Sequence, residues 1–154
     1  MTELISKNVS AAILSRGYGR KSTGYFDVSV DSKAEVVGDE PLLLKSRLKD
    51  VSVVVSESRK EGVIKLEQKI KPAVVVLDDA YQHRKVKAGL YILLTEFHRP
   101  YFSDYIMPAG RLRESRQGEK RADVVIVTKS PAHVSQKQKT WFLEKINICL
   151  LYTS

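Results

Sequence analysis

The sequence contains the segment Val74-Val75-Val76-Leu77-Asp78-Asp79, which gives the strongest indication of the fold. Its consecutive apolar, mostly β-branched residues predict a strand that is buried on both faces. The two aspartates at its carboxyl end favour an open α/β sheet, because such sheets bind their ligands at the carboxyl edge of the strands. The stretch therefore predicts a sheet covered by helices, with two carboxylates at its functional edge.

Similar short apolar runs recur along the chain, with helical or loop segments between them. This alternation is typical of βα units around a mostly parallel sheet. Residues 25–30 alternate apolar and polar side chains instead, so we expect a hairpin or an edge strand there. The other expected strands are Ala11–Leu14, Val51–Val55, Leu90–Leu94 and Val124–Val127, and the expected helices are Pro41–Lys49, Arg59–Lys69, Ser115–Ala122 and Val134–Ile146.

The composition is that of a folded protein. A length of 154 residues suffices for one domain with its own core, and 43% apolar with 29% charged residues are ordinary for a globular protein. The single cysteine, Cys149, excludes an internal disulfide and fits a reducing, cytoplasmic setting. Residues 1–10 contain no signal segment, and the longest apolar runs are only strand-sized, so we expect no membrane-spanning helix.

A net charge of +8 favours a polyanionic partner, such as nucleic acid, an anionic membrane surface or a phosphorylated substrate. Many of the basic residues sit beside turn residues rather than along one helix face. The sequence also lacks the interleaved aromatic and basic residues with which proteins stack single-stranded nucleic acid. We therefore expect no nucleic-acid partner, and a basic binding module would be distinguished by a steep dependence of affinity on salt.

Asp78 and Asp79 are candidate metal ligands, because Mg²⁺ prefers hard oxygen ligands and bridges phosphate oxygens in nucleotide-handling folds. The alternative is a strand that ends in a turn, with one aspartate capping a helix. His83, a few residues further on, is expected to be a solvated surface imidazole.

Gly38-Asp39-Glu40-Pro41 places an acidic pair at the start of a helix. Capping chemistry alone explains this pattern, because Asp, Glu and Pro all suit the first turn. A carboxylate at this place also suits the base that accepts the proton of an attacking hydroxyl. Both interpretations of Asp39 stay open at the level of the residues.

Two further turns carry arginines. The segment 108–114 presents Arg111 on a turn that contains Pro and Gly, and guanidinium groups suit two-point contacts to phosphate, although solvated arginines fit equally well. Residues 15–20 read Ser-Arg-Gly-Tyr-Gly-Arg directly after the first strand. The third glycine of a dinucleotide-binding loop is absent and no helix follows promptly, so we reject that interpretation.

These motifs, in this order, resemble the tetraacyldisaccharide 4'-kinase family over about Ala11 to Pro131. The closing Arg121-Ala122-Asp123 and Val127-Thr128-Lys129 belong to the resemblance as well. Where the family commonly has glycine after the paired aspartates, this chain has Ala80, a change that matters only if the backbone there needs a positive φ.

The resemblance implies an α/β, P-loop-NTPase-like three-layer fold, incomplete at both ends. It implies an ATP-dependent kinase that phosphorylates the 4'-hydroxyl of a tetraacyldisaccharide 1-phosphate in lipid A biosynthesis, with ATP and Mg²⁺. The lipid disaccharide would be a partner, and so would the anionic inner face of the inner membrane, where the full-length protein would be peripheral on the cytoplasmic side. The implied roles are a general base for Asp39, metal ligation for Glu40, Asp78 and Asp79, and phosphate or substrate binding for Arg59 and Arg111.

The resemblance also implies missing parts. A phosphate loop ending in Gly-Lys-Thr or Gly-Lys-Ser is expected just before Met1, with residues 1–7 as the end of its helix, and the histidine partner of Asp39 is expected beyond the C-terminal end. Residues 1–133 would form a partial kinase core, and residues 134–154 a helix and an irregular tail. We expect the chain alone to be inactive. The alternative function is a nucleotide-dependent regulatory or scaffold ATPase.

Overall fold

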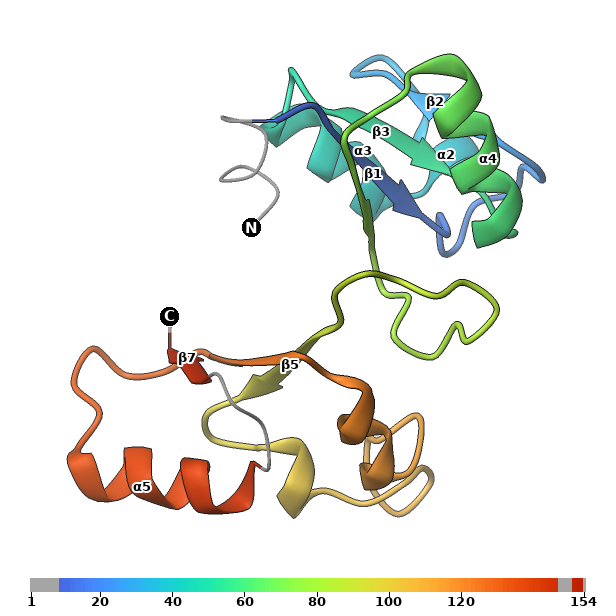
Figure 1. Ribbon diagram of the computed structural model, residues 1–154. Coiled ribbons are helices and arrows are strands. Elements are labelled where there is room, and N and C mark those ends of the chain that lie inside the picture. Colours follow the sequence, from blue (N-terminus) through green and yellow to red (C-terminus); the bar gives the residue numbers. More distant parts are fainter. Residues whose placement is uncertain (1–8, 147–150, 154) are drawn as a thin grey trace. The chain divides into compact units, whose positions relative to one another are not determined.

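The computed structural model describes residues 9–146 and 151–153 of the chain. The chain divides into two compact units, Met1–Val86 and Lys87–Ser154, each with its own sheet. Figure 1 traces the elements of both units in chain order. The helix expected at residues 1–7, and residues 147–150 and 154 of the expected tail, lie outside the described residues.

The first unit contains a four-stranded sheet of order β2-β3-β1-β4. Strand β1 (Ala11–Ser15) pairs in parallel with β3 (Ser52–Val55) on one side and with β4 (Val74–Leu77) on the other. Strand β2 (Phe26–Val28) runs antiparallel along β3 at the edge of the sheet. The mostly parallel sheet and the edge strand expected at residues 25–30 are both confirmed.

Helices cover both faces of this sheet, as the continuous apolarity of its strands predicts. Helices α2 (Ala34–Val37) and α3 (Asp39–Arg47) cover one face, where Ile13 packs in a core cluster with Val37. Helix α4 (Arg59–Lys69) covers the other, where the neighbouring Leu14 packs in a second cluster with Leu66. Because successive strand residues point to opposite faces, β1 supplies both cores of a three-layer arrangement.

The helices of the first unit differ in detail from the expected ones. Helix α4 has the expected bounds, and its N-cap Ser58 accepts a hydrogen bond from the backbone N–H of Glu61. Helix α3 begins at Asp39, ahead of the expected Pro41, because Gly38 ends α2 and directly caps α3. The short α2 was not expected, since four residues are too few to show a helical period.

The second unit contains a three-stranded, parallel sheet of order β5-β6-β7, built from β5 (Ile92–Glu96), β6 (Val124–Thr128) and β7 (Leu151–Thr153). Strand β5 begins later than the expected Leu90, which is exposed. Strand β7 falls in the tail for which the sequence showed no pattern. The segment expected as a helix near Ser115 forms a 3₁₀-helix, η2 (Arg116–Arg121).

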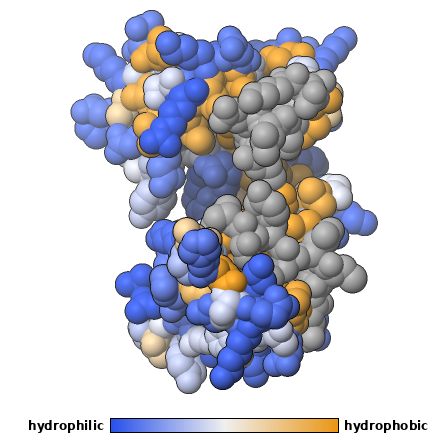
Figure 2. Space-filling model, turned by 90° about the vertical axis from the view of Figure 1, so that its left-hand side faces the viewer, coloured by the Kyte–Doolittle hydropathy of each residue, from blue (hydrophilic) through white to orange (hydrophobic). Residues whose placement is uncertain are grey.

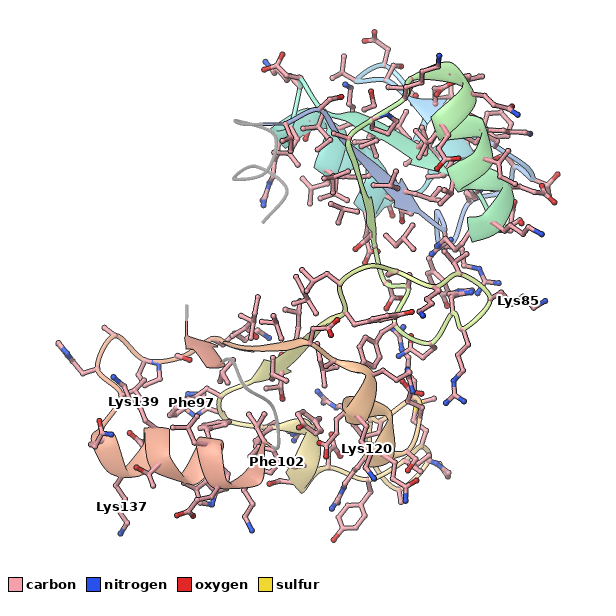
Figure 3. All side chains as sticks on the ribbon, in the orientation of Figure 1. Lys85, Phe97, Phe102, Lys120, Lys137 and Lys139 are labelled. Carbon is pink, nitrogen blue, oxygen red and sulfur yellow. The ribbon has the colours of Figure 1, made fainter. Side chains whose placement is uncertain are left out.

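Aromatic side chains hold helix α5 (Gln136–Lys145) in the second unit. Phe142 is buried, and its ring centroid lies 5.3 Å from that of Phe97 and 5.7 Å from that of Phe102. Phe102 comes from the 3₁₀-helix η1 (Tyr101–Ser103) and also contacts Trp141. Figure 3 labels Phe97 and Phe102 beside α5, which carries Lys137 and Lys139.

Most of the surface seen in Figure 2 is hydrophilic, with smaller apolar patches between the charged side chains. Exposed apolar residues occur in both units, for example Tyr18 and Leu43 in the first and Leu94 and Met107 in the second. Within residues 9–146 and 151–153, no helix combines the length and the apolar character needed to cross a membrane.

Candidate active site

The carboxyl edge of the first sheet brings three chain segments together. Because β1, β3 and β4 are parallel, their carboxyl ends meet at the same edge. The backbone N–H of Ser56, just after β3, donates to the carbonyl of Ser15 over 3.0 Å. The backbone N–H of Asp78, just after β4, donates to the carbonyl of Leu14 over the same distance, 3.0 Å. The loops after all three strands therefore start as neighbours.

Arg59 lies buried beneath this edge, with only 3% of the residue exposed. It is the first residue of α4 and directly follows the N-cap Ser58. Its guanidinium donates to the carbonyl of Ser56 over 2.8 Å and to the carbonyl of Asp78 over 3.2 Å. These bonds join the exit of β3 to the exit of β4 and satisfy carbonyl groups that would otherwise be costly to bury.

The charges around Arg59 identify its neighbours. Burial and the positive charge of Arg16 lower the pKa of Arg59, and the carboxylates of Asp78 and Asp79 oppose this shift. Arg16 follows β1 directly and is exposed. Two cations and two carboxylates therefore gather where β1 and β4 end.

His83 belongs to the same cluster. It is half-buried, rather than a fully solvated imidazole as expected. Burial, followed by the charges of Arg59 and Arg16, lowers the pKa of His83 below its ordinary value of 6.5, and Asp79 opposes the shift. A neutral imidazole at pH 7 can both donate and accept a hydrogen bond.

The backbone turns sharply at Asp79, which has a φ of 44°. Aspartate tolerates this left-handed conformation better than most residues. Among the described residues, Ala80 is not one of those with a positive φ. Ala80, where the family commonly has glycine, therefore needs no left-handed backbone conformation and adds no backbone strain.

Asp39 and Glu40 are exposed in the first turn of α3, close to the loop that leaves β1. A Cβ placed on Gly38 would lie 3.1 Å from the carbonyl oxygen of Tyr18 and 3.2 Å from the Cα of Gly17. Only a glycine, with its φ of 93°, allows the two backbones to approach so closely. This contact places Asp39 at the same edge of the sheet as Asp78 and Asp79.

The donor set at this edge fits a metal–phosphate group. In the part of the chain that the structure describes, no three or more His, Cys, Asp or Glu side chains form a ready cluster, so Glu40 does not join Asp78 and Asp79 in a preformed cage. Mg²⁺ does not require such a cage, because it keeps several waters and binds through one or two carboxylates together with phosphates. The adjacent guanidinium groups of Arg16 and Arg59 suit phosphate oxygens.

Arg111 belongs to the second unit and is exposed. Its backbone N–H donates to Oδ1 of Asp104 over 3.4 Å within the turn. Its charge also reaches Glu96, whose pKa is lowered first by the hydrogen bond and charge of Lys129 and further by Arg111 and Arg99. The turn thus lies beside the carboxyl end of β5 in its own sheet.

Sequence reasoning gave no role to Arg16. The segment 15–20 is not a dinucleotide loop, since β2 rather than a helix follows it. The signal was nevertheless present, since Arg16 follows the first strand as directly as Asp78 follows the third parallel one. The rule that strand ends meet at one edge applies to it equally.

The family model described as Tetraacyldisaccharide-1-P 4'-kinase matches residues 1–151. The chain is 46% identical to the tetraacyldisaccharide 4'-kinase of Flavobacterium johnsoniae over 149 residues, which cover 96% of this chain and 44% of that protein. It is 43% identical to the kinase of the same description from Bacteroides fragilis strain YCH46 over 150 residues, covering 96% and 40%.

A solved structure is similar as well. It is the crystal structure of the "apo" form of LpxK from Aquifex aeolicus in complex with ATP, and it matches with a TM-score of 0.76 and 28% sequence identity. The match covers 97% of this chain and 63% of that one. The chain spans less than half the length of the two curated relatives above, at 44% and 40%.

Proposed function

The chain belongs to the tetraacyldisaccharide-1-P 4'-kinase family, and on this premise we propose that it forms part of an ATP-dependent kinase of lipid A biosynthesis. The proposed reaction moves the γ-phosphoryl group of ATP to the 4'-hydroxyl of a tetraacyldisaccharide 1-phosphate. The observation that supports this function best is the cluster of Arg16, Arg59, Asp78, Asp79 and His83 at the carboxyl edge of the first sheet.

Asp39 is proposed as the general base. Its carboxylate, exposed at the start of α3, would accept the proton of the attacking hydroxyl as the new bond to phosphorus forms. The close contact between the backbones of Gly17 and Gly38 fixes the point at which α3 begins. Asp39 is the first residue of this helix, so its position is fixed as well. A positioned base of this kind contributes roughly 10²- to 10⁴-fold to a rate.

Asp78 and Asp79 are proposed to hold Mg²⁺, with Glu40 as a further metal-site carboxylate. When bound, magnesium and ATP supply the transferable phosphoryl group and a cation that offsets its negative charge. Arg59 and Arg16 would stabilise charge on phosphate oxygens, since both guanidinium groups lie beside the two aspartates. Arg111 is proposed to bind phosphate or substrate from the second unit.

The names of the relatives support the substrate class, and the solved neighbour supports nucleotide binding. The curated relatives are described as tetraacyldisaccharide 4'-kinases, and the Aquifex aeolicus structure contains ATP. A lipid disaccharide substrate makes contact with a membrane surface necessary. The net charge of +8 suits the anionic inner face of the inner membrane, where we place the full-length protein as a peripheral, cytoplasmic enzyme.

The test is an assay of 4'-phosphate formation on the lipid disaccharide by a chain of full family length. Such a chain is obtained by replacing the matched 149-residue segment of the Flavobacterium johnsoniae relative with this sequence. We expect the unchanged chimera to be active and Asp39→Asn to lower kcat roughly 10²-fold or more. The control variant is Asp50→Asn, an exposed aspartate at the turn that precedes β3.

Two results would contradict the proposal. Full activity of the Asp39→Asn chimera would remove the base from this position. ATP hydrolysis that proceeds without any phosphorylation of the lipid would favour the regulatory or scaffold ATPase instead.

A further inference from the structure

Arg20 is a buried cation to which the proposed reaction gives no role. Its side chain is 3% exposed, and one terminal nitrogen lies 2.5 Å from Oε1 of Glu57. The same nitrogen donates to the carbonyl of Gly24 over 2.6 Å, and the other donates to Oγ of Ser22 over 3.1 Å. The guanidinium also lies over the ring of Phe26, 5.7 Å from its centroid. Both terminal nitrogens of this buried guanidinium are therefore bonded, and such charge-assisted bonds fix the geometry of the groups that accept them.

Glu57, the partner of Arg20, is held in its ionised form. Burial by itself would raise the pKa of Glu57, but the backbone N–H groups of Glu57 and Gly24 and the charge of Arg20 outweigh it, so the pKa lies below its ordinary value. The N–H of Gly24 donates to the second carboxylate oxygen over 2.9 Å. Both oxygens of Glu57 are therefore committed to the loop after β1.

This loop is in turn fastened to the helix that leads to Asp39. Oγ of Ser22 donates to the carbonyl of Val36, and the backbone N–H of Lys21 donates to the carbonyl of Glu35 over 2.7 Å. The stem of Arg20 packs against Gly17, where an added Cβ would lie 2.6 Å from Cδ of Arg20 and 2.8 Å from the carbonyl oxygen of Val37. Val37 is followed by Gly38 and then by Asp39, so the contacts reach the start of α3.

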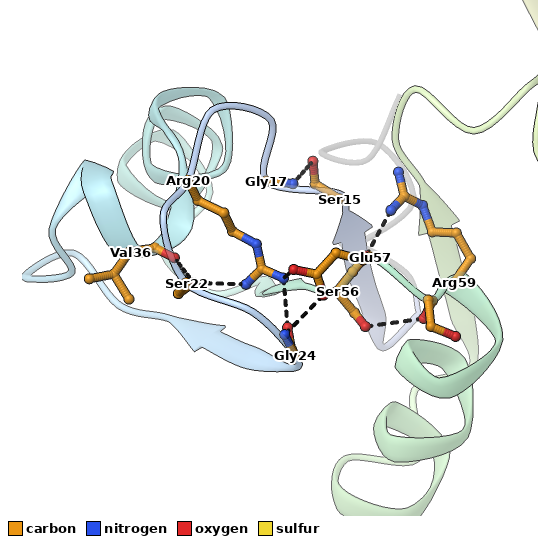
Figure 4. A network of polar contacts seen from close by, with 10 residues as sticks. Ser15, Gly17, Arg20, Ser22, Gly24, Val36, Ser56, Glu57 and Arg59 are labelled. Atoms are coloured by element: carbon orange, nitrogen blue, oxygen red, sulfur yellow. Dashed lines mark hydrogen bonds and ion pairs between the residues drawn. The ribbon is translucent and has the colours of Figure 1, made fainter.

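In the other direction the network reaches the phosphate side of the site. Glu57 is preceded by Ser56, whose carbonyl accepts the hydrogen bond from Arg59. Arg59 then bonds the carbonyl of Asp78. Figure 4 shows the network from Val36 through Arg20 and Glu57 to Arg59. The Arg20–Glu57 pair thus lies between the element that carries Asp39 and the element that carries Arg59.

We propose that Arg20 is a positioning residue, which through Glu57 and Ser22 sets the place of Asp39 relative to Arg59 and Asp78. The inference rests on the proposed function of Asp39. Phosphoryl transfer depends on the placement of its groups, and a displacement of about 1 Å costs roughly 10²-fold in rate. Lysine cannot replace Arg20, because one ammonium lacks the planar fork that serves Glu57, Gly24 and Ser22 together.

The first test is hydrogen–deuterium exchange on the 154-residue chain with Arg20→Lys and Glu57→Gln. We expect faster exchange in residues 17–24 and 35–42, and unchanged protection in β1, β3 and β4. The control is Lys21→Met, which removes only an exposed ion pair with Glu35, whose side chains are 78% and 72% exposed. Uniform loss of protection, or a change no larger than in the control, would overturn the proposal.

The second test measures kinetics in the full-length chimera, at a temperature where every variant is fully folded. We expect Arg20→Lys and Glu57→Gln to lower kcat roughly 10- to 100-fold while KM for ATP stays unchanged, since the placement of the base and not nucleotide affinity is altered. A purely structural role would leave kcat at its original value under these conditions.

Asp39→Asn measured beside these variants separates the two claims. If Asp39→Asn is fully active, Asp39 is not the base, and the positioning role of Arg20 is overturned as well. If Asp39→Asn is impaired but Arg20→Lys keeps its kcat, the base stands and the positioning role alone is overturned.

Discussion

Arg59 and Arg111 are the two arginines that sequence reasoning singled out, and the molecule holds them in opposite ways. Arg59, in the first unit, is 3% exposed and is fixed by the carbonyls of two strand exits. Arg111, in the second unit, has an exposed side chain at the tip of a turn. Of two arginines that are both proposed to bind phosphate, one is thus held inside the fold and the other is exposed, and the sequence motif alone does not distinguish the two.

The turn that carries Arg111 is nevertheless well built. The backbone N–H of Leu112 donates to the carbonyl of Tyr105 over 3.0 Å, and that of Met107 donates to the carbonyl of Leu112 over 3.0 Å. A Cβ on Gly110 would lie 2.2 Å from the carbonyl oxygen of Tyr105. The backbone is therefore rigid where the side chain is exposed, which suits a group that contacts a ligand only when the ligand is present.

The largest expected effect comes from removing the buried arginine. Arg59→Met deletes two charge-assisted hydrogen bonds and leaves the carbonyls of Ser56 and Asp78 without that donor, so we expect a loss of roughly 2–4 kcal/mol in the free energy of unfolding. Arg111→Met should change it by less than about 0.5 kcal/mol, as for most surface substitutions. Urea denaturation of both variants measures the two changes in the free energy of unfolding. Equal losses would show that the two arginines are not held differently.

The glycines after β1 allow a matched comparison of the next largest effect. Gly17→Ala should cost roughly 2–3 kcal/mol, because its φ is 70° and its Cβ would press on the carbonyl oxygen of Val37 at 2.8 Å. Gly19→Ala has a similar φ, 76°, but no atom within 4 Å of the added Cβ, so only about 1 kcal/mol is expected. Thermal unfolding of the two variants isolates the cost of separating this loop from the end of α2.

The charge cluster predicts the behaviour of His83. Burial and the charges of Arg59 and Arg16 disfavour the imidazolium, so His83 should titrate below 6.5 in an NMR experiment. Arg16→Gln should move the pKa back up, whereas Asp79→Asn should lower it further. Shifts in the opposite directions would show that these side chains do not share one site.

The same shift predicts a dependence of stability on pH. The folded pKa is lower than the unfolded one, so below pH 6.5 the unfolded chain binds the proton more readily. The contribution of His83 is therefore fully present above pH 6.5 and is lost as the pH falls toward the folded pKa. His83→Gln should flatten the loss of stability in this interval, as measured by urea denaturation at several pH values.

The smallest effect is expected at the edge strand. Lys69 pairs with Asp27 of β2 over 3.2 Å, but the two side chains are 55% and 58% exposed, so solvent and salt screen the pair. Lys69→Gln should change the free energy of unfolding by less than about 0.5 kcal/mol, and added salt should reduce even that difference. A loss comparable with that of Arg59→Met would mean that, in this unit, the exposure of a side chain does not predict its contribution to the free energy of unfolding.

The strands of the first unit could be predicted because runs of consecutive apolar residues leave a strong trace. The expected burial on both faces holds for Ala11–Ser15 but not for Val74–Leu77, which lies at the edge of the sheet and is only half-buried. Val74–Leu77 and Ala11–Ser15 are apolar or small throughout, and the positions of Asp78 and Asp79 follow directly from them. Helix α4 was equally clear, since Ser58 caps it and Leu66 faces the core. These features depend on neighbours along the chain and on one rule about parallel strands.

The remaining features depend on contacts between distant residues. No sequence pattern around Arg20 predicts its ion pair with Glu57. The close contact between Gly17 and Gly38 likewise joins two segments that share no pattern of apolar residues. The burial of Arg59 was likewise hidden, because an arginine at the first position of a helix is ordinarily solvated. The same limit applies to β7, whose pairing with β6 no local pattern predicts.

We propose that phosphate and metal bind at the carboxyl edge of the first sheet. An NMR titration of the isotope-labelled 154-residue chain with Mn²⁺ and ATP measures this binding directly, since Mn²⁺ uses the same oxygen ligands as Mg²⁺ and broadens signals near it. We predict selective broadening of residues 15–19, 38–40 and 78–83, with Asp79→Asn weakening it throughout this set. Broadening that is strongest around Glu96 and Glu119 in the second unit, or that is uniform along the chain, would show that metal and nucleotide do not bind at this edge of the sheet.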